Sequence, residues 1–381
     1  FADDLEELVA LARQRAAAID PDRPAYDVLI DAFEPGMTMA KLDVVFAQLR
    51  DFLVPFLAQI AQRPAPDTSV ISADVPQAEQ EAVARALAET LGYDFKHGRM
   101  DTAVHPFCGG AGATDVRITT RYSREHFHRS LLAVVHETGH AMYEQGRDRG
   151  LADQPVSLAR SMGVHESQSL LWETQVARSA AFWRGRLPWL AHRYPFLQGV
   201  SVEDFVGALN AVDFTNAIRV SADEVTYPLH VILRYELERD LFSGALEVRD
   251  LPAAWNERMQ AWFGFVPESD AQGVLQDIHW CMGAFGYFPS YTLGALYAAQ
   301  LYAAAQRALP DLDAQLAAGT FTPLRDWLRE HVHQHGSRWP TDELITRATG
   351  SSLDARWFIA HIQERYAALY GLTTGSAATA G

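Results

Sequence analysis

Two histidines four residues apart, with a glutamate directly after the first, constrain this chain more than any other feature. His136, Glu137 and His140 form the pattern His-Glu-Thr-Gly-His. Positions i and i+4 lie on one face of an α-helix, so both imidazoles can ligate the same metal ion. Residues 130–135 are apolar enough to bury such a helix. The pattern predicts a metal site with Glu137 as the base for a water on the metal. The alternative is a structural helix with two histidines bonded to polar partners.

A catalytic zinc ion usually takes three protein ligands and a water, so a third ligand is required. Glu144 lies on the same predicted helix, but it is rotated by about 80° from His136. Glu166 follows His140 by 26 residues, which allows a turn and a returning antiparallel helix. We therefore predict Glu166 as the third ligand. His165 competes with it, but we expect His165 to support a ligand or to contact substrate.

Two other patterns do not supply a metal site. The extended metzincin motif requires a histidine at position 146, and this residue is Gly146. His331 and His335 share a predicted helical face, but no carboxylate lies between them where a base is needed. We expect this second pair to be exposed or structural.

A His-Glu-x-x-His helix is typical of zinc peptidases, and a peptidase also needs groups that bind the ends of its substrate. Arg117 lies in the predicted strand at 115–122, and Arg219 follows Ile218. The planar guanidinium group matches a carboxylate with two parallel hydrogen bonds. Both arginines are candidates for binding a terminal carboxylate. The alternative for each is a structural ion pair, with Asp115 or Asp223 as the partner.

A polar cluster lies in the otherwise apolar segment at 273–280. Gln276 and His279 belong to it, and burying such groups is costly unless they are paired or functional. Tyr287 and Tyr291 follow shortly afterwards, and either phenol could donate a hydrogen bond to an oxyanion. Aromatic core packing is the alternative for both tyrosines.

Composition limits the classes of function. The 381 residues include 48% hydrophobic and 21% charged residues, as is typical of a soluble globular protein. The formal net charge of −16 argues against nucleic acid or an anionic membrane as partner, because both select clustered positive charge. No apolar run reaches the length of a transmembrane helix. Cys108 and Cys281 lack the C-x-x-C spacing, and the acidic N-terminus does not resemble a signal peptide, so a reducing compartment is expected.

Apolar residues at three- and four-residue spacing predict that helices dominate the fold. Short linkers predict one helical domain over residues 1–371, with a disordered tail at 372–381. A glycine-rich turn is expected at 108–112, ahead of the predicted strand. The predicted helices are at 42–60, 76–91, 130–146, 161–184, 202–221, 226–243, 252–263, 268–283, 291–309, 322–335, 342–348 and 353–370.

These stretches, taken together and in order, carry a family resemblance. From about residue 24 to residue 371, the chain resembles the carboxypeptidase Taq family of zinc metallocarboxypeptidases. Family members usually have a longer N-terminal helical region than the one ahead of Pro24 here. The matching motifs are at 105–107, 115–119, 136–140, 165–168, 218–223 and 273–280.

The resemblance implies an all-α, mainly helical fold like that of neurolysin, with a deep central groove and a small β-sheet beside the metal site. It implies a cytoplasmic homodimer that removes C-terminal residues from peptides, with Zn²⁺ as cofactor and Co²⁺ as a possible substitute. Two alternatives remain open. One is a zinc oligopeptidase that cleaves internal bonds, and the other is a non-catalytic peptide-binding scaffold stabilised by a metal.

The resemblance also implies a role for each matching residue. Zinc ligands, a general base, groups for the oxyanion and groups for the substrate are all represented. The implied zinc ligands are His136, His140 and Glu166, and the implied general base is Glu137. His279 and Tyr291 are implied for the oxyanion, with Tyr287 in reserve. The groups for the substrate are Arg117, Arg219, His165 and Gln276.

Overall fold

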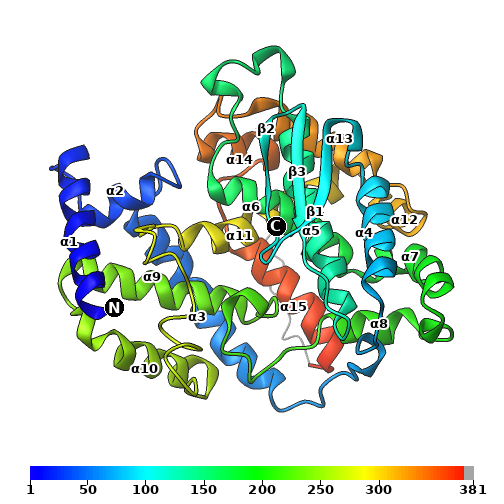
Figure 1. Ribbon diagram of the computed structural model, residues 1–381, viewed down its shortest axis with the longest axis horizontal. Coiled ribbons are helices and arrows are strands. Elements are labelled where there is room, and N and C mark those ends of the chain that lie inside the picture. Colours follow the sequence, from blue (N-terminus) through cyan, green and yellow to red (C-terminus); the bar gives the residue numbers. More distant parts are fainter. Residues whose placement is uncertain (373–381) are drawn as a thin grey trace. The chain divides into compact units, whose positions relative to one another are not determined.

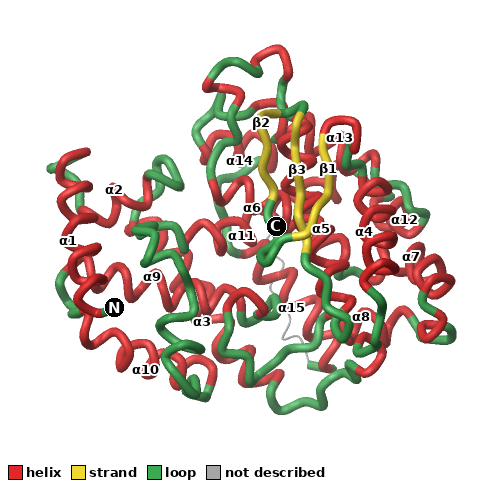
Figure 2. Tube along the Cα trace, viewed as in Figure 1, coloured by secondary structure: helices red, strands yellow, loops and turns green. Residues whose placement is uncertain are grey.

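The computed structural model describes residues 1–372, and Figure 1 shows the course of the chain. Most of these residues lie in helices, and three short strands form one small sheet (Figure 2). The predicted mainly helical fold is thereby confirmed. From residue 373 onward, the expected disordered tail lies outside the residues that the structure describes. The chain divides into two compact units, and the boundaries at 293/294 and 357/358 fall within helices.

Within the described residues, unit 1 comprises 1–65, 212–293 and 358–372. Its helix α3 buries one apolar stripe that includes Phe46 and Leu49, and Thr38 caps its N-terminus by accepting a hydrogen bond from the Lys41 amide. Buried Glu238 accepts hydrogen bonds from Tyr26, Trp280 and the Gly286 amide. The helices are α1 (Ala2–Ile19), α2 (Ala25–Asp31), α3 (Met39–Ile60), α9 (Tyr227–Ser243) and α10 (Leu251–Phe263), with the start of α11 (Pro289–Ala308) and most of α15 (Arg356–Tyr370).

Unit 2 comprises residues 66–211 and 294–357. Its sheet has the order β1-β3-β2, in which β1 (Gly98–Thr102) runs parallel to β3 (Asp115–Thr120) and β2 (Cys108–Gly112) runs antiparallel to it. The helices are α4 (Gln77–Leu91), α5 (Phe127–Gly146), α6 (Met162–Leu170), α7 (Ala180–Arg193), α8 (Val202–Leu209), α12 (Leu312–Ala317), α13 (Thr322–His331) and α14 (Thr341–Thr349), with the rest of α11.

The segment at 108–112 is a strand, so the predicted glycine-rich turn is wrong. One of its glycines, Gly110, is explained by close packing on β3. A Cβ atom at Gly110 would lie 1.8 Å from the carbonyl oxygen of Asp115, and the φ of Gly110 is +155°. Only a residue without a side chain fits this approach, and the missing side chains also hid the strand from pattern reading.

The sheet and α4 together cover one face of α5. Val134 and Ala141 of α5 belong to a buried cluster with Val116 and Ile118 of β3. Ala84 and Ala88 of α4 join the same cluster. On a helix of 3.6 residues per turn, Val134 and Ala141 lie about 130° away from the two motif histidines. This packing anchors α5 by its apolar face and leaves the histidine face for another element.

The predicted helix at 161–184 is divided into three parts. After α6 the backbone enters the π-helical segment η5 (Leu171–Ala177), and α7 begins anew after Ser179 caps it through the Phe182 amide. A π-helix changes the angular position of each residue, so simple 3.6-residue spacing misplaces the side chains here. Glu173, discussed below, lies in this segment.

Two predicted helices are wrong in part or entirely. The helix at 202–221 ends as α8 at Leu209, because Asp213 and Asn216 accept hydrogen bonds from nearby backbone amides and so favour turns. The segment at 268–283 forms turns in place of a helix. Its apolar residues have helical spacing, but Ile278 and Met282 are 66% and 70% exposed. Polar contacts, and not an apolar face, determine its conformation.

Candidate active site

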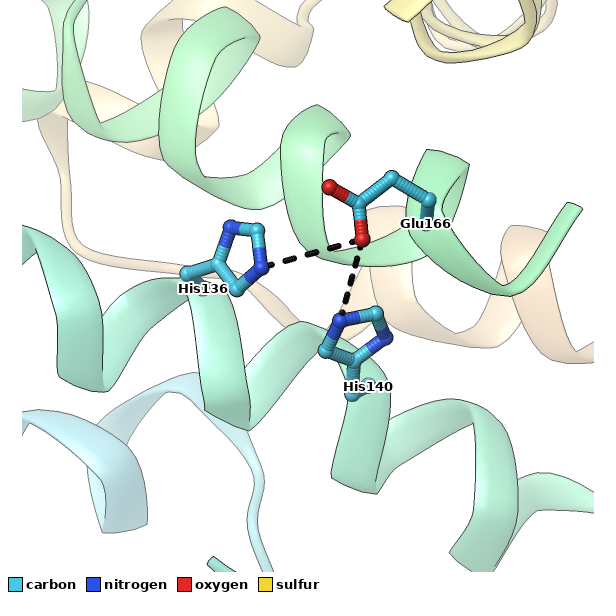
Figure 3. Close-up of side chains that lie close together, drawn as sticks. All are labelled: His136, His140 and Glu166. Atoms are coloured by element: carbon cyan, nitrogen blue, oxygen red, sulfur yellow. Dashed lines mark ion pairs between the residues drawn. The ribbon is translucent and has the colours of Figure 1, made fainter. Parts of the chain in front are cut away.

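The first group of predicted site residues lies in unit 2, where α5 presents both motif histidines on one face. Figure 3 shows His136 and His140 on this helix and Glu166 reaching toward them from α6. The Oε2 atom of Glu166 lies 3.4 Å from Nε2 of His140 and 3.9 Å from Nε2 of His136. The structure therefore brings together the three ligands that were predicted. We call these three residues the metal group.

No other cluster in residues 1–372 has the composition and spacing of a metal site. One ligand atom from each member of the metal group lies within 4.8 Å of the other two. Glu144 points to other partners, as its angular position on the helix predicted. His331 bonds the carbonyl oxygen of Trp327 and stacks on that ring. The prediction that His331 and His335 do not form a metal site agrees with these contacts.

Two glycines allow the close approach that forms the metal group. A Cβ atom at Gly139 of α5 would lie 2.4 Å from the carbonyl oxygen of Gln168 in α6. A Cβ atom at Gly294 of α11 would lie 2.6 Å from Cγ of Glu166. Real Cβ contacts are not this short, so any side chain at either position would displace Glu166 or its helix.

Each metal-group histidine has a second partner on its other ring nitrogen. His136 Nδ1 lies 2.9 Å from a carboxylate oxygen of Glu173, which also pairs with Arg178. His140 Nδ1 lies 2.6 Å from Nδ1 of His165. Such contacts orient imidazole ligands and leave Nε2 for the metal. Sequence reasoning missed Glu173, although it follows Glu166 by seven residues, a separation of about two helical turns.

Burial and charge set the protonation of the metal group. Burial raises the pKa of Glu166, but its hydrogen bond with His140 and the charge of His136 outweigh this and lower the pKa to about 2. Burial lowers the pKa of His140 to about 4. Burial also opposes a charge on His136, but Glu173 and Glu166 outweigh it and raise its pKa to about 10. An ionised carboxylate and a neutral His140 are the forms that bind metal, and binding at His136 displaces a proton.

Glu137 lies beside the metal group without joining it. Its side chain is 5% exposed, and its Oε2 atom is buried without a hydrogen-bond partner. Burial raises the pKa of Glu137 to about 7. A buried carboxylate oxygen without a partner is costly in a folded protein, which is the expected situation for a group whose partner is a bound reactant. With two imidazoles and one carboxylate, these residues fit a catalytic zinc site.

The second group lies in unit 1 and is cationic. Arg219 donates two hydrogen bonds, of 3.0 and 2.8 Å, to one carboxylate oxygen of Asp277, and Arg234 donates one of 2.6 Å to the other. Arg234 is fully buried, and its Nη2 atom has no hydrogen-bond partner. We call Arg219, Arg234 and Asp277 the arginine group. Sequence reasoning missed Arg234, because nothing around it distinguishes it from a surface residue of α9.

Other predicted residues surround the arginine group. Gln276 accepts a hydrogen bond from the Arg219 amide and donates to the carbonyl oxygen of Ala217. His279 Nε2 lies 3.0 Å from the hydroxyl of Tyr291, and the ring of Tyr291 lies 4.4 Å from the Arg219 guanidinium. Tyr287 packs edge-on against Tyr291. Four residues that the sequence predicted, together with Arg219, are thus neighbours in the fold of unit 1.

Arg117 has a different environment. It projects from β3, is 55% exposed, and forms a two-point ion pair with Asp115. Both residues line an open hollow of about 480 Å³ on the sheet, beside Asp101 and Phe107. The structural ion pair weighed for Arg117 is present, with the partner named in advance.

Comparison with known proteins decides the family. The family profile described as carboxypeptidase Taq (M32) metallopeptidase matches residues 1–366. The chain belongs to this family. The M32 chain is 42% identical to carboxypeptidase 1 of Bacillus subtilis over 372 residues, which cover 97% of the chain and 74% of that relative. It is 42% identical to thermostable carboxypeptidase 1 of Thermus thermophilus over 381 residues, with the same coverage.

Solved structures agree with the family and the fold. The M32 carboxypeptidase of Deinococcus radiodurans superposes with a TM-score of 0.94 at 41% identity, over 96% of this chain and 74% of that one. Our chain is therefore an M32 metallocarboxypeptidase, which confirms the predicted metallocarboxypeptidase activity. Within residues 1–372, no helix of this M32 protein combines the length and hydropathy needed to cross a membrane.

Proposed function

We propose that this carboxypeptidase depends on Zn²⁺, which His136, His140 and Glu166 hold, and that Glu137 is its general base. The convergence of two imidazole nitrogens and one carboxylate oxygen beside the buried Glu137 supports this proposal most strongly. Two histidines with one glutamate are a donor set typical of zinc peptidases. Co²⁺ accepts the same nitrogen and oxygen donors, so it is proposed as a substitute.

The chain's own residues move the proton. When bound, zinc lowers the pKa of its water toward about 7 and polarises the scissile carbonyl. Glu137 accepts the proton from the attacking water through its buried carboxylate and passes it to the leaving amine. Burial suits Glu137 to both steps, because a base with a pKa near 7 can take up and release a proton at neutral pH.

We propose Arg219 as the group that binds the terminal carboxylate of the substrate. Asp277 faces two guanidinium groups, Arg219 and Arg234, so this buried set carries an excess of positive charge. A buried excess charge is unfavourable until a counter-charge binds, and a peptide carboxylate supplies one. Arg117 remains the second candidate, but its charge is already balanced by Asp115 at an exposed position.

Tyr291 and His279 are proposed to stabilise the oxyanion, with Tyr287 as the alternative phenol. The contact between His279 Nε2 and the Tyr291 hydroxyl supports a shared role, because each can orient the donor of the other. One such donor is typically worth about 3 kcal/mol of transition-state stabilisation. For Gln276, its contacts support a role in positioning Arg219 rather than in touching substrate.

A peptide digest tests the proposal. The purified chain is incubated with a peptide that has a free C-terminus and with the same peptide amidated, and products are followed by mass spectrometry. We expect stepwise loss of single C-terminal residues from the free peptide and much slower cleavage of the amide. A chelator should stop the reaction and added Zn²⁺ should restore it. Internal fragments, or full activity after prolonged incubation with excess chelator, would contradict the proposal.

Two further properties are proposed from the family resemblance alone. We propose that the protein is a homodimer and that it acts in the cytoplasm on peptides with a free C-terminus. Light scattering during size-exclusion chromatography tests the first, with twice the chain mass expected. Cell fractionation with an antibody tests the second.

A further inference from the structure

The two histidines of the metal group reach carboxylates by different routes. His136 Nδ1 contacts Glu173 directly at 2.9 Å. His140 Nδ1 contacts another imidazole, that of His165, at 2.6 Å. Nε2 of His165 then lies 2.9 Å from a carboxylate oxygen of Glu144. Nδ1 of His136 is therefore linked to a carboxylate directly, whereas Nδ1 of His140 is linked to one through the imidazole of His165.

Both routes end on a carboxylate held by an arginine. Glu173 pairs with Arg178 at 3.2 Å, and Glu144 pairs with Arg147 at 2.8 Å. Arg147 is buried and also donates to the carbonyl oxygen of Ser157. Each terminal carboxylate is thus ionised and fixed in place, as an anchor for a hydrogen-bonded chain requires.

When His140 binds metal, the protons on the His140 and His165 rings can be placed in only one way. A ligating imidazole offers Nε2 to the ion and keeps its proton on Nδ1, so His140 must donate at Nδ1. Nδ1 of His165 must then accept, which places its own proton on Nε2. That proton points to Glu144, whose carboxylate can only accept. Each of the two ring-nitrogen contacts, His140 to His165 and His165 to Glu144, then joins one donor to one acceptor.

We propose that His165 and Glu144 are positioning residues for the metal. They fix the tautomer and ring plane of His140, and they slow loss of the ion. We call His140, His165, Glu144 and Arg147 the His140 relay. The inference rests on the proposed metal site and adds to it two residues, His165 and Glu144, that act through His140.

The decisive experiment measures the affinity for Zn²⁺ itself, without peptide. The full-length chain competes for Zn²⁺ with a chromogenic chelator, and the variants are His165→Leu and His165→Gln. Leucine removes both ring nitrogens. Glutamine keeps an acceptor for His140 and a donor for Glu144, so it can preserve the relay. We expect His165→Leu to raise the Zn²⁺ Kd roughly 10–100-fold, as for other residues that orient metal ligands, and His165→Gln to stay within about threefold.

His361 supplies a matched control. It also bonds a glutamate, Glu224, at 2.7 Å, and it is 15% exposed against 21% for His165, but it belongs to unit 1. His361→Leu should lower the melting temperature of the metal-free chain without changing the Zn²⁺ Kd. A loss of affinity specific to His165→Leu, restored in His165→Gln, is not expected from a merely structural residue.

Three outcomes would overturn the inference. One is a Zn²⁺ Kd for His165→Leu within twofold of the parent chain, and another is an equal loss in His165→Gln. If His165→Leu does not fold, Glu144→Gln decides, because removing the terminal charge should weaken binding at least about threefold and no change would refute the relay. Failure of the parent chain to bind Zn²⁺ would instead refute the proposed metal site.

Discussion

The surroundings of the metal group and the arginine group differ in the sign of their charge. Around the metal group, unit 2 places the carboxylates of Glu137, Glu144, Glu166 and Glu173 against two arginines, Arg147 and Arg178. In unit 1, two guanidinium groups share the single carboxylate of Asp277. His136, whose pKa is raised to about 10, is a third cation, so the first set keeps one negative charge when Glu137 is ionised, and the second set keeps one positive charge. Each set also contains a buried polar atom without a partner, on Glu137 and on Arg234.

This difference shows what an unbalanced buried charge indicates about the group that binds there. A protein interior tolerates charges when they are paired, and leaving one unpaired costs several kcal/mol. An excess that persists in the fold therefore indicates a missing partner of the opposite sign. On our proposal, that partner is Zn²⁺ for the metal group and the terminal carboxylate of a peptide for the arginine group. A metal-dependent carboxypeptidase requires both.

Replacing Glu137 tests the anionic side with the largest expected effect. Glu137→Gln keeps the shape but cannot accept the proton, so turnover of a free peptide should fall by roughly 10²–10⁴-fold. The Zn²⁺ content should stay that of the parent chain, because Glu137 is outside the metal group. Steady-state kinetics and elemental analysis measure the two quantities. Loss of zinc in this variant would contradict the role assigned to Glu137.

Replacing Arg219 tests the cationic side. Arg219→Lys keeps the charge but loses the planar two-point geometry, and a hydrogen bond to a charged group contributes about 1.5–3 kcal/mol. We expect kcat/KM for the free peptide to fall roughly 10–100-fold, with little change for the amidated peptide. Arg117→Lys is the control and should leave kcat/KM nearly unchanged. The reverse result would transfer the carboxylate-binding role to Arg117.

Adding a methyl group at Gly294 should sharpen the comparison, because the three atoms nearest to the new Cβ all belong to Glu166 of the metal group. The new Cβ would overlap Cβ and Cγ of Glu166, which must move away from His140. We expect Gly294→Ala to weaken Zn²⁺ binding and to cost about 1–3 kcal/mol of folding stability. Chelator competition and chemical denaturation measure these effects. Alanine favours helices, so unchanged metal affinity with increased stability would show that α11 adapts without moving Glu166.

The smallest effect is expected at the exposed pair of Arg117 and Asp115. Water and salt screen this pair, so Arg117→Ala should change the free energy of unfolding by less than about 1 kcal/mol. Urea denaturation at low and high salt measures the change. A larger cost would mean that the β3 arginine is more than a surface ion pair.

Local patterns predicted the metal group well and the arginine group poorly. His136 and His140 are predictable because four-residue spacing places both on one helical face, and Glu166 because the chain can return within 26 residues. Arg219 was recognisable as a candidate, but Arg234 and its shared use of Asp277 were not. Their meeting depends on turns at 268–283, where helical spacing of exposed apolar residues predicted a helix that does not form.

The sequence by itself determined the helical class, the two imidazoles on one face, the glutamate beside them and the family. These features depend on contacts within one or two helical turns, or on motifs that can be recognised in the amino-acid sequence itself. The tertiary structure alone decided the strand made of glycines, the π-helical position of Glu173, the His140 relay and the balance of charge in the arginine group. Each of these depends on which distant groups become neighbours when water is excluded, and no local spacing encodes that.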